Sequence, residues 1–96
     1  MLNSKQKAHL KSLANPLKPL ILIGKDGLTL NLIESTKVSL KAHELVKVSV
    51  LKSCTDDVRQ MMLDLSAQTH SEVVTEIGRT FVLFKVSEKH KIELPQ

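Results

Sequence analysis

The sequence has few of the residues on which several common protein classes depend. Its 96 residues include one cysteine, two phenylalanines and no tryptophan or tyrosine. A single cysteine, Cys54, cannot close an internal disulfide, which is typical of a reducing compartment. An RNA-recognition-motif sheet or a single-strand stacking platform needs exposed rings. Phe81 and Phe84 lie among apolar neighbours and are predicted to be core, so these two classes are excluded.

Long apolar runs are also missing. No uninterrupted apolar run exceeds four residues, as in Leu20 to Ile23, whereas a bilayer span needs roughly 20. The first fourteen residues carry Lys5, Lys7 and Lys11 at spaced positions, without the apolar core and small-residue cleavage site of a secretory signal. We therefore expect a cytoplasmic protein without a membrane partner.

The motifs of the common enzyme and metal-site classes do not occur. There is no Cys-x-x-Cys, no His-x-x-x-His, no G-x-S-x-G elbow and no glycine-rich nucleotide loop. The histidines are scattered, at His9, His43, His70 and His90. We expect no cofactor, no metal, no small-molecule substrate and no catalytic activity. Acidic neighbours at Asp56 and Asp57 disfavour a reactive thiolate at Cys54, for which we predict a structural role.

Positive charge is present and unevenly distributed. The chain has 14 Lys and Arg against 10 Asp and Glu, a net charge of +4. Residues 1–48 hold eight lysines and three acids, whereas residues 49–96 hold six basic and seven acidic residues. Such an asymmetry is typical of a face that binds a polyanion, although a solvated lysine-rich surface gives the same counts. The apolar fraction of 42% and the charged fraction of 25% fit one small globular domain over residues 1–96.

The first half of the chain predicts two helices around a strand. Ser4 is a candidate N-cap for a short helix that ends near Asn15, because a residue before proline is disfavoured in the helical region. The apolar run of residues 20–23 has no alternation, which predicts a strand covered on both faces or central in a sheet. A second helix is predicted over residues 28–43, with Thr29 as a possible cap and Leu28, Leu32, Thr36 and Leu40 spaced by four along one side.

The second half predicts a helix and three strands. Valines alternate with polar residues from Glu44 to residue 50, as in a half-buried strand with one wet face. After Thr55-Asp56-Asp57 a third helix follows, with its methionines in the core. Strands over residues 72–77 and 80–86 are joined by Gly78-Arg79, as in a type II′ hairpin. The predicted order is α-β-α-β-α-β-β, an α/β fold of the two-layer α+β type with a four-stranded mixed sheet. The helices that follow strands cover one side, and residues 87–96 form a polar tail.

One short motif stands between the first strand and the second helix: Gly24-Lys25-Asp26-Gly27. Two glycines three apart let the backbone turn without Cβ atoms in the way, so amides at the helix N-terminus can approach a phosphate. KH domains use such a GXXG loop to clamp the backbone of single-stranded nucleic acid. Lys25 adds a positive charge there, and Asp26 opposes it unless its carboxylate caps the helix. At such a turn two glycines more often indicate only a positive φ, so the motif alone does not distinguish an RNA-binding loop from an ordinary turn.

Several landmarks in order resemble the stand-alone bacterial YhbY-type RNA-binding proteins, the single-domain form of the CRM (chloroplast RNA splicing and ribosome maturation) domain. The resemblance runs from Ser4 to the end of the chain. It is carried by Lys5-Gln6-Lys7, His9-Leu10-Lys11, Asn15-Pro16-Leu17-Lys18-Pro19, Ile23-Gly24-Lys25-Asp26-Gly27-Leu28-Thr29, His43-Glu44-Leu45-Val46-Lys47-Val48, Ile77-Gly78-Arg79-Thr80-Phe81-Val82-Leu83-Phe84 and Lys91-Ile92-Glu93-Leu94-Pro95.

The resemblance implies a fold like the C-terminal domain of bacterial translation initiation factor three, and a GXXG loop used for RNA. For the short bacterial members it also implies association with ribosomal RNA in precursors of the large ribosomal subunit. We expect a non-enzymatic protein that acts as a monomer in this role. The predicted RNA-binding residues are Gly24, Lys25, Asp26 and Gly27 of the loop, with Lys5, Lys7 and Lys11 of the first helix and Lys18 of the following turn.

Two alternatives come from other functional classes. A protein-interaction module could use the exposed sheet face around Lys47 and Ser49, and its binding would depend little on salt. A small enzyme could assemble a site from Cys54 and a histidine only in three dimensions. Alkylation of Cys54 without loss of function would exclude that form of the enzyme.

Overall fold

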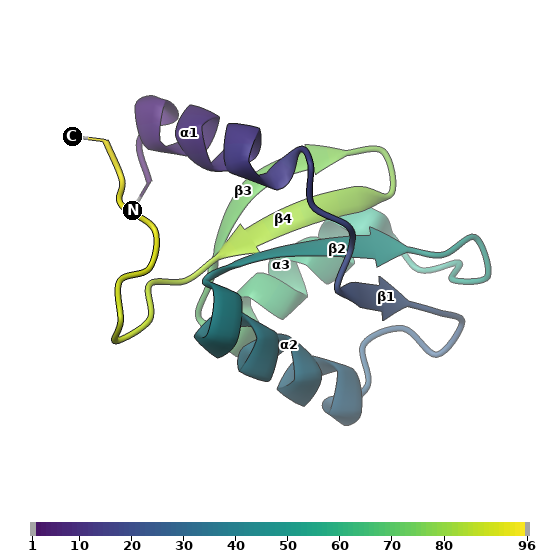
Figure 1. Ribbon diagram of the computed structural model, residues 1–96. Coiled ribbons are helices and arrows are strands. Elements are labelled where there is room, and N and C mark those ends of the chain that lie inside the picture. Colours follow the sequence, from purple (N-terminus) through teal and green to yellow (C-terminus); the bar gives the residue numbers. More distant parts are fainter. Residues whose placement is uncertain (1, 96) are drawn as a thin grey trace.

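The chain forms a four-stranded mixed sheet with helices on both faces, and the computed structural model describes residues 2–95 (Figure 1). The strands are β1 (Ile21–Ile23), β2 (Leu45–Val50), β3 (Glu72–Ile77) and β4 (Thr80–Phe84), in the spatial order β1-β2-β4-β3. β1 pairs parallel with β2, and the other pairs are antiparallel. The predicted fold class and element order are confirmed. The likeness to initiation factor three stays a prediction.

Two helices cover one face of this sheet and one helix covers part of the other. α2 (Leu30–His43) and α3 (Val58–Thr69) follow β1 and β2, and both lie on the same face, as the right-handed crossover rule requires (Figure 1). α1 (Ser4–Ala14) packs across the other face, near β2 and β3. None of these helices, within residues 2–95, has both the length and the apolarity needed to cross a membrane.

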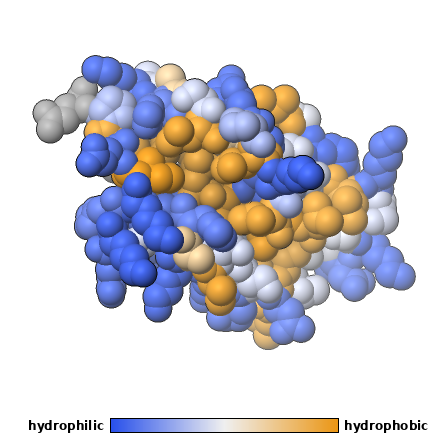
Figure 2. Space-filling model, in the orientation of Figure 1, coloured by the Kyte–Doolittle hydropathy of each residue, from blue (hydrophilic) through white to orange (hydrophobic). Residues whose placement is uncertain are grey.

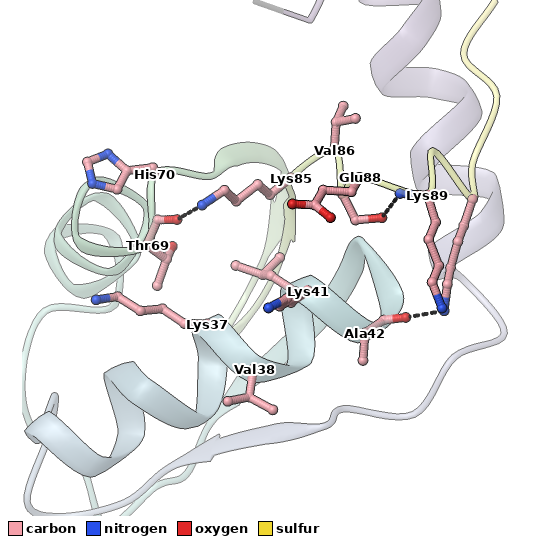
Figure 3. Close-up of a pocket in the computed structure, with 13 residues that line it drawn as sticks. Lys37, Val38, Lys41, Ala42, Thr69, His70, Lys85, Val86, Glu88 and Lys89 are labelled. Carbon is pink, nitrogen blue, oxygen red and sulfur yellow. Dashed lines mark hydrogen bonds between the residues drawn. The ribbon is translucent and has the colours of Figure 1, made fainter.

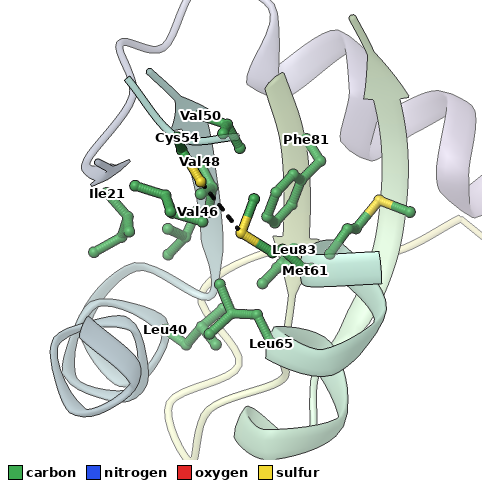
Figure 4. Packing of buried hydrophobic residues seen from close by; sticks show 12 residues of the cluster. Ile21, Leu40, Val46, Val48, Val50, Cys54, Met61, Leu65, Phe81 and Leu83 are labelled. Carbon is green, nitrogen blue, oxygen red and sulfur yellow. Dashed lines mark hydrogen bonds between the residues drawn. The ribbon is translucent and has the colours of Figure 1, made fainter. Parts of the chain in front are cut away.

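The main core lies between the sheet and the pair α2 and α3 (Figure 4). Val46, Val48 and Val50 point into it from β2, as their period of two predicts. Met61, Met62 and Leu65 fill it from α3, and Phe81 is fully buried there. The predicted core roles of the phenylalanines and methionines are confirmed. Cys54 is also buried in this cluster, with its Sγ 3.8 Å from Sδ of Met61.

A second, smaller core lies under α1. Its buried members are Leu2, Leu10, Ala14, Leu45, Val74, Val82 and Phe84, and Ile92 and Leu94 pack against it. A register shift in β3 between Val73 and Thr75 makes this possible, because it turns Val73 toward the main core and Val74 toward α1. The C-terminal segment, considered a polar tail on sequence grounds, therefore contributes two apolar side chains to the fold.

The placement of the first strand was predicted wrongly. β1 is an edge strand, and only one of its faces is covered: Ile21 and Ile23 are buried, whereas Leu22 is 55% exposed. In a strand covered on one face, every second side chain is buried and the one between is exposed. Leu22 and the preceding Leu20 are left on the open part of the face that carries α1.

The start of α1 and the end of β4 also differ from the predictions. The N-cap of α1 is Asn3 rather than Ser4. The Asn3 side chain accepts from Gln6 N–H, and the Gln6 side chain accepts from Asn3 N–H, which forms a capping box. α1 ends at Ala14 as predicted, but Asn15 before Pro16 keeps helical angles, so the proline does not displace that residue. β4 ends at Phe84 rather than at residue 86, because Ser87 binds the Glu44 carboxylate and turns the chain away from the sheet.

β1, α2 and β2 begin one or two residues later than predicted, at Ile21, Leu30 and Leu45. The predicted helix caps and the predicted hairpin are confirmed. Thr29 caps α2, which begins at Leu30, and the α3 N-cap is Asp57, within the predicted opening segment. Gly78 has φ +59 and Arg79 has no positive φ, the pattern of the predicted type II′ hairpin.

Candidate nucleic-acid interface

The glycine motif forms a hydrogen-bonded turn between β1 and α2. Gly27 N–H donates to the carbonyl of Gly24 at 3.0 Å, so Lys25 and Asp26 occupy the corners of the turn and both are exposed. Gly27 has φ +67, a conformation that favours glycine. Gly24 has no positive φ, and a Cβ there would meet no atom within 4 Å. Only one of the two glycines is therefore required by the fold, and space for a ligand remains at the other.

Unpaired amides gather where this turn meets α2. Thr29 accepts from Leu32 N–H at 3.1 Å through its side chain and from Ile33 N–H through its carbonyl. The N–H groups of Leu30 and Asn31, in the first turn of the helix, have no partner within residues 2–95. Asp26 does not cap the helix, so of the two possibilities for its carboxylate the one that remains is opposition to the charge of Lys25. Free amides and the positive end of the helix dipole form a setting in which a phosphate oxygen is stabilised.

A neighbouring loop, residues 51–57, supports the turn from behind. A Cβ on Gly27 would lie 2.6 Å from Oδ2 of Asp56, so this carboxylate packs directly against the glycine. Leu51 N–H donates to the carbonyl of Ile23, which ties the loop to the end of β1. Within the turn and this contact, one lysine (Lys25) stands against two carboxylates (Asp26 and Asp56). Attraction for a phosphate at this place therefore depends mainly on the backbone amides.

Arg79 holds the supporting loop in shape, a role that sequence reasoning missed. Its guanidinium donates to the carbonyls of Val50, Leu51 and Cys54 at 3.1, 2.8 and 2.8 Å. Three backbone acceptors in one short loop suit the planar fork of arginine, which a lysine ammonium cannot reproduce. In the sequence Arg79 is recognisable only as a hairpin residue, because its partners lie 25 to 29 positions away.

The predicted basic residues do not converge on the turn. Lys5, Lys7 and Lys11 are exposed on α1, which packs on the face of the sheet opposite to α2 (Figure 1). Lys18 is exposed in the segment that crosses from α1 to β1. Its neighbourhood also contains Lys47, whose ammonium donates to the carbonyl of Leu17 at 3.2 Å. A ligand that touched both the turn and α1 would have to pass around the edge of the sheet at β1.

Glu44 organises the C-terminal segment at the other end of α2. It is fully buried, has φ +65, and ends the helix. Its carboxylate accepts from the N–H and hydroxyl of Ser87 and from Ile92 N–H. Burial would raise the pKa of Glu44, but these hydrogen bonds, with one from the Lys91 backbone, outweigh it and lower the pKa to about 2. The carboxylate is therefore charged at neutral pH and fixes residues 87–92 beside α2.

The open sheet face has an apolar surface. Leu17, Leu20, Leu22 and Ile77 are between 42% and 61% exposed, and Figure 2 shows apolar side chains gathered across the middle of the face that carries α1. Lys47 and Ser49 of β2 are only partly exposed on this face. A hollow of about 240 Å³ lies between the end of α1 and the strands, lined by Ala14, Asn15, Lys47, Thr75, Ile77, Thr80 and Val82.

The described part of the chain, residues 2–95, brings together no group of three His, Cys, Asp or Glu side chains that could hold a metal ion. Cys54 is buried, and the neighbour of its thiol within residues 2–95 is the sulfur of Met61 rather than a histidine. The alternative of an enzyme built from Cys54 and a histidine therefore finds no support in these side chains.

Comparisons with known proteins relate the chain to one family. The model of the CRS1/YhbY (CRM) domain matches residues 2–85. The chain is 43% identical over 96 residues to the "Probable RNA-binding protein YqeI" of Bacillus subtilis (strain 168), covering 99% of this chain and 100% of that protein. It is 35% identical over 95 residues to an "RNA-binding protein" of Haemophilus influenzae, covering 99% and 96%. The solution structure of the hypothetical protein SAV1595 from Staphylococcus aureus superimposes with a TM-score of 0.82 at 41% identity, covering 99% and 100%.

Proposed function

Because this chain belongs to the CRS1/YhbY (CRM) domain family, we propose that it binds RNA, and that its partner is ribosomal RNA in precursors of the large ribosomal subunit. It would act in the cytoplasm as a monomer and without a catalytic step. The names of its relatives, all given as RNA-binding or probable RNA-binding proteins, support RNA binding. The ribosomal part rests on the sequence resemblance.

The observation that supports RNA binding best is the turn of Gly24–Gly27 with the start of α2. Gly24 leaves open space, and the amides of Leu30 and Asn31 are unpaired within residues 2–95. A phosphate placed there would accept hydrogen bonds from these two N–H groups, which have no acceptor within residues 2–95. Such contacts recognise the backbone and position the RNA, without base readout. Lys25 adds one point charge, and Lys5, Lys7, Lys11 and Lys18 would contact a longer RNA that passes the sheet edge.

The loop assignment can be tested with a pair of variants at one position. Gly24→Asp places a carboxylate at the proposed phosphate contact, whereas Gly24→Ala adds only a methyl group. Because a Cβ at residue 24 meets nothing and the φ is not positive, both variants should fold. We expect Gly24→Asp to bind RNA at least tenfold more weakly than Gly24→Ala at the same salt concentration. Equal affinities for the two variants would exclude the turn as a phosphate contact.

The ribosomal assignment needs a separate measurement. Lysate sedimented through sucrose gradients at low and moderate salt should show the protein with free or immature large subunits, and this association should decrease as salt rises. Gly24→Asp should move the protein toward the top of the gradient, and Gly24→Ala should not. If the protein remained at the top under all conditions, its proposed ribosomal partner would be wrong even if purified protein bound RNA.

A further inference from the structure

A basic groove lies at the opposite end of α2 from the glycine turn. It is formed by the second half of α2, the end of α3 and residues 85–91, and it encloses about 850 Å³ (Figure 3). This volume falls within the roughly 300–1,000 Å³ typical of ligand sites. α2 has 14 residues, so at about 1.5 Å per residue the groove lies roughly 20 Å from the turn. We call it the α2–tail groove.

The lining of the α2–tail groove is strongly basic. Its charged lining is Lys37, Lys41, Lys85, Lys89, Lys91 and Glu88, a balance of +4. The chain as a whole is also +4, with 14 basic and 10 acidic residues. A lining with this charge attracts a polyanion, as do the exposed lysines of α1.

Two of these lysines remove the charge that would otherwise repel an anion here. The C-terminal ends of α2 and α3 both face the groove, and helix C-termini carry partial negative charge. Lys85 donates to the carbonyl of Thr69 at the end of α3, at 3.3 Å, and Lys91 donates to the carbonyl of Ala42 at the end of α2 (Figure 3). Both helix ends are thereby compensated, and the remaining lysines are available to a ligand.

The other three lysines, Lys37, Lys41 and Lys89, make few interactions with the protein through their ammonium groups. Lys37 lies 3.4 Å from Glu34 in an exposed pair, which is a weak interaction. The ammonium groups of Lys41 and Lys89 have no hydrogen-bond or ion-pair partner within residues 2–95. These two lysines come from α2 and from the C-terminal segment, 48 positions apart in the sequence. The Glu44 carboxylate brings the two segments together through Ser87 and Ile92.

The lining between the lysines is mostly apolar, and this selects among anionic ligands. Val38, Leu40, Ala42 and Val86 contribute to it, and Val38 and Val86 are 68% and 48% exposed. The phosphates of a regular duplex need only a charged surface, whereas a concave apolar surface bordered by ammonium groups also accommodates the flat face of a base. Aliphatic side chains can support a base in the absence of aromatic rings.

We infer that the α2–tail groove binds an unpaired nucleotide of single-stranded RNA, with the base against the apolar lining and its neighbouring phosphates on Lys41 and Lys89. The inference rests on the RNA binding proposed above and adds a second contact at the far end of α2. An RNA that contacted both ends of α2 would be held at two points. The groove would then add salt-dependent attraction through two phosphate contacts, and the glycine turn would fix the register of the backbone.

Two charge-matched double variants test this inference. Lys41→Ala with Lys89→Ala removes both unpartnered ammonium groups of the groove. Lys52→Ala with Arg59→Ala removes two exposed charges elsewhere and leaves the same net charge. The probes are a fluorescent oligouridylate of twelve nucleotides and a blunt RNA duplex of equal length, titrated at several salt concentrations. Thermal unfolding checks that both variants keep the parent fold.

For the groove variant we expect oligouridylate binding about tenfold weaker than for the control variant. The slope of log affinity against log salt should fall by about 1.4, since each phosphate contact on a single strand contributes roughly 0.7. Duplex binding should change much less. An oligouridylate carrying 4-thiouridine should crosslink to peptides from residues 37–42 or 85–89.

The other outcomes separate this inference from the proposed function. If Gly24→Asp loses RNA while the groove variant matches its control, the groove assignment is wrong and RNA binding at the turn stands. If the groove variant loses oligouridylate and duplex equally, the groove binds phosphates without an unpaired base. If the parent binds neither RNA, both proposals fail. If it binds a polyglutamate peptide, and the groove variant loses only that peptide, the groove serves an acidic protein.

Discussion

The carboxylate of Asp56 packs directly against Gly27, at a distance that leaves no room for a side chain. A Cβ at residue 27 would lie 2.6 Å from Oδ2 of Asp56, and the positive φ of Gly27 independently favours glycine. Gly24, three residues earlier, is subject to neither constraint. The two glycines of the motif therefore have different roles. Gly27 is needed to build the turn, whereas Gly24 keeps space free at its surface.

The first prediction follows from this difference. Gly27→Ala should lower the free energy of unfolding by about 1–3 kcal/mol, because it combines a left-handed alanine with a contact that must be relieved. Gly24→Ala should stay within about 0.5 kcal/mol of the parent. Urea unfolding monitored by circular dichroism measures both. Adding Asp56→Ala to Gly27→Ala should recover the part of the loss due to the contact and leave the part due to φ. Equal losses at both glycines would contradict the assignment.

The elements of the fold could be predicted because their signals are local. Val46, Val48 and Val50 alternate within one strand, and Met61, Met62 and Leu65 repeat within one helix, so neighbouring residues suffice to define each element. The position of β1 could not be predicted in this way. Whether Leu22 is covered depends on which strand pairs beside it and on where α1 packs. Neither is encoded in the four apolar residues themselves.

Only the part of the candidate site that neighbouring residues form could be predicted from the sequence. The turn of Gly24–Gly27 is local and was recognised. Its contact with Asp56 and the support from Arg79 connect segments 25 to 29 residues apart and left no local pattern. The α2–tail groove was missed because Lys41 and Lys89 belong to different halves of the chain. Charges counted by segment along the sequence do not show that lysines of α2 and of residues 85–91 lie together in one groove.

The second prediction concerns Arg79. Arg79→Lys should lower the free energy of unfolding by about 1–2 kcal/mol, because one ammonium cannot serve the carbonyls of Val50, Leu51 and Cys54 together. For a domain of this size the midpoint of thermal unfolding should fall by roughly 4–8 °C per kcal/mol. Arg59→Lys is the control, since Arg59 contributes only an exposed pair with Glu76. A parent-like midpoint for Arg79→Lys would show that the loop holds its shape without the guanidinium.

The third prediction concerns the charges at the turn. Lys25→Ala should weaken RNA binding and lower the salt slope by roughly one unit, with similar effects on all RNA sequences. Asp26→Asn should strengthen binding, because it removes an exposed carboxylate from a place that would face a phosphate. Titrations of one RNA at several salt concentrations measure both changes. If the two substitutions shift affinity in the same direction, the phosphate does not lie near this turn.

The fourth prediction concerns pH and Glu44. The folded protein keeps this carboxylate charged down to a pKa of about 2, whereas the unfolded chain takes up the proton near the ordinary value of 4.5. Between these values the unfolded state binds more protons, so the stabilisation is complete above about pH 4.5 and is lost as the pH falls toward 2. Glu44→Gln should cost about 1–3 kcal/mol at pH 7, because the hydrogen bonds from Ser87 and Ile92 lose their charged acceptor.

That cost should shrink as the pH falls through this window, because protonation removes the same charge from the parent protein. Urea unfolding of the parent and of Glu44→Gln between pH 7 and pH 2 measures the difference. Glu93→Gln, an exposed position on the same segment, is the control and should follow the parent throughout. A difference that stayed constant down to pH 2 would mean that the side chain of Glu44 contributes through its shape rather than its charge. In that case the α2–tail groove would keep its form under acid, since residues 87–92 would remain fixed beside α2.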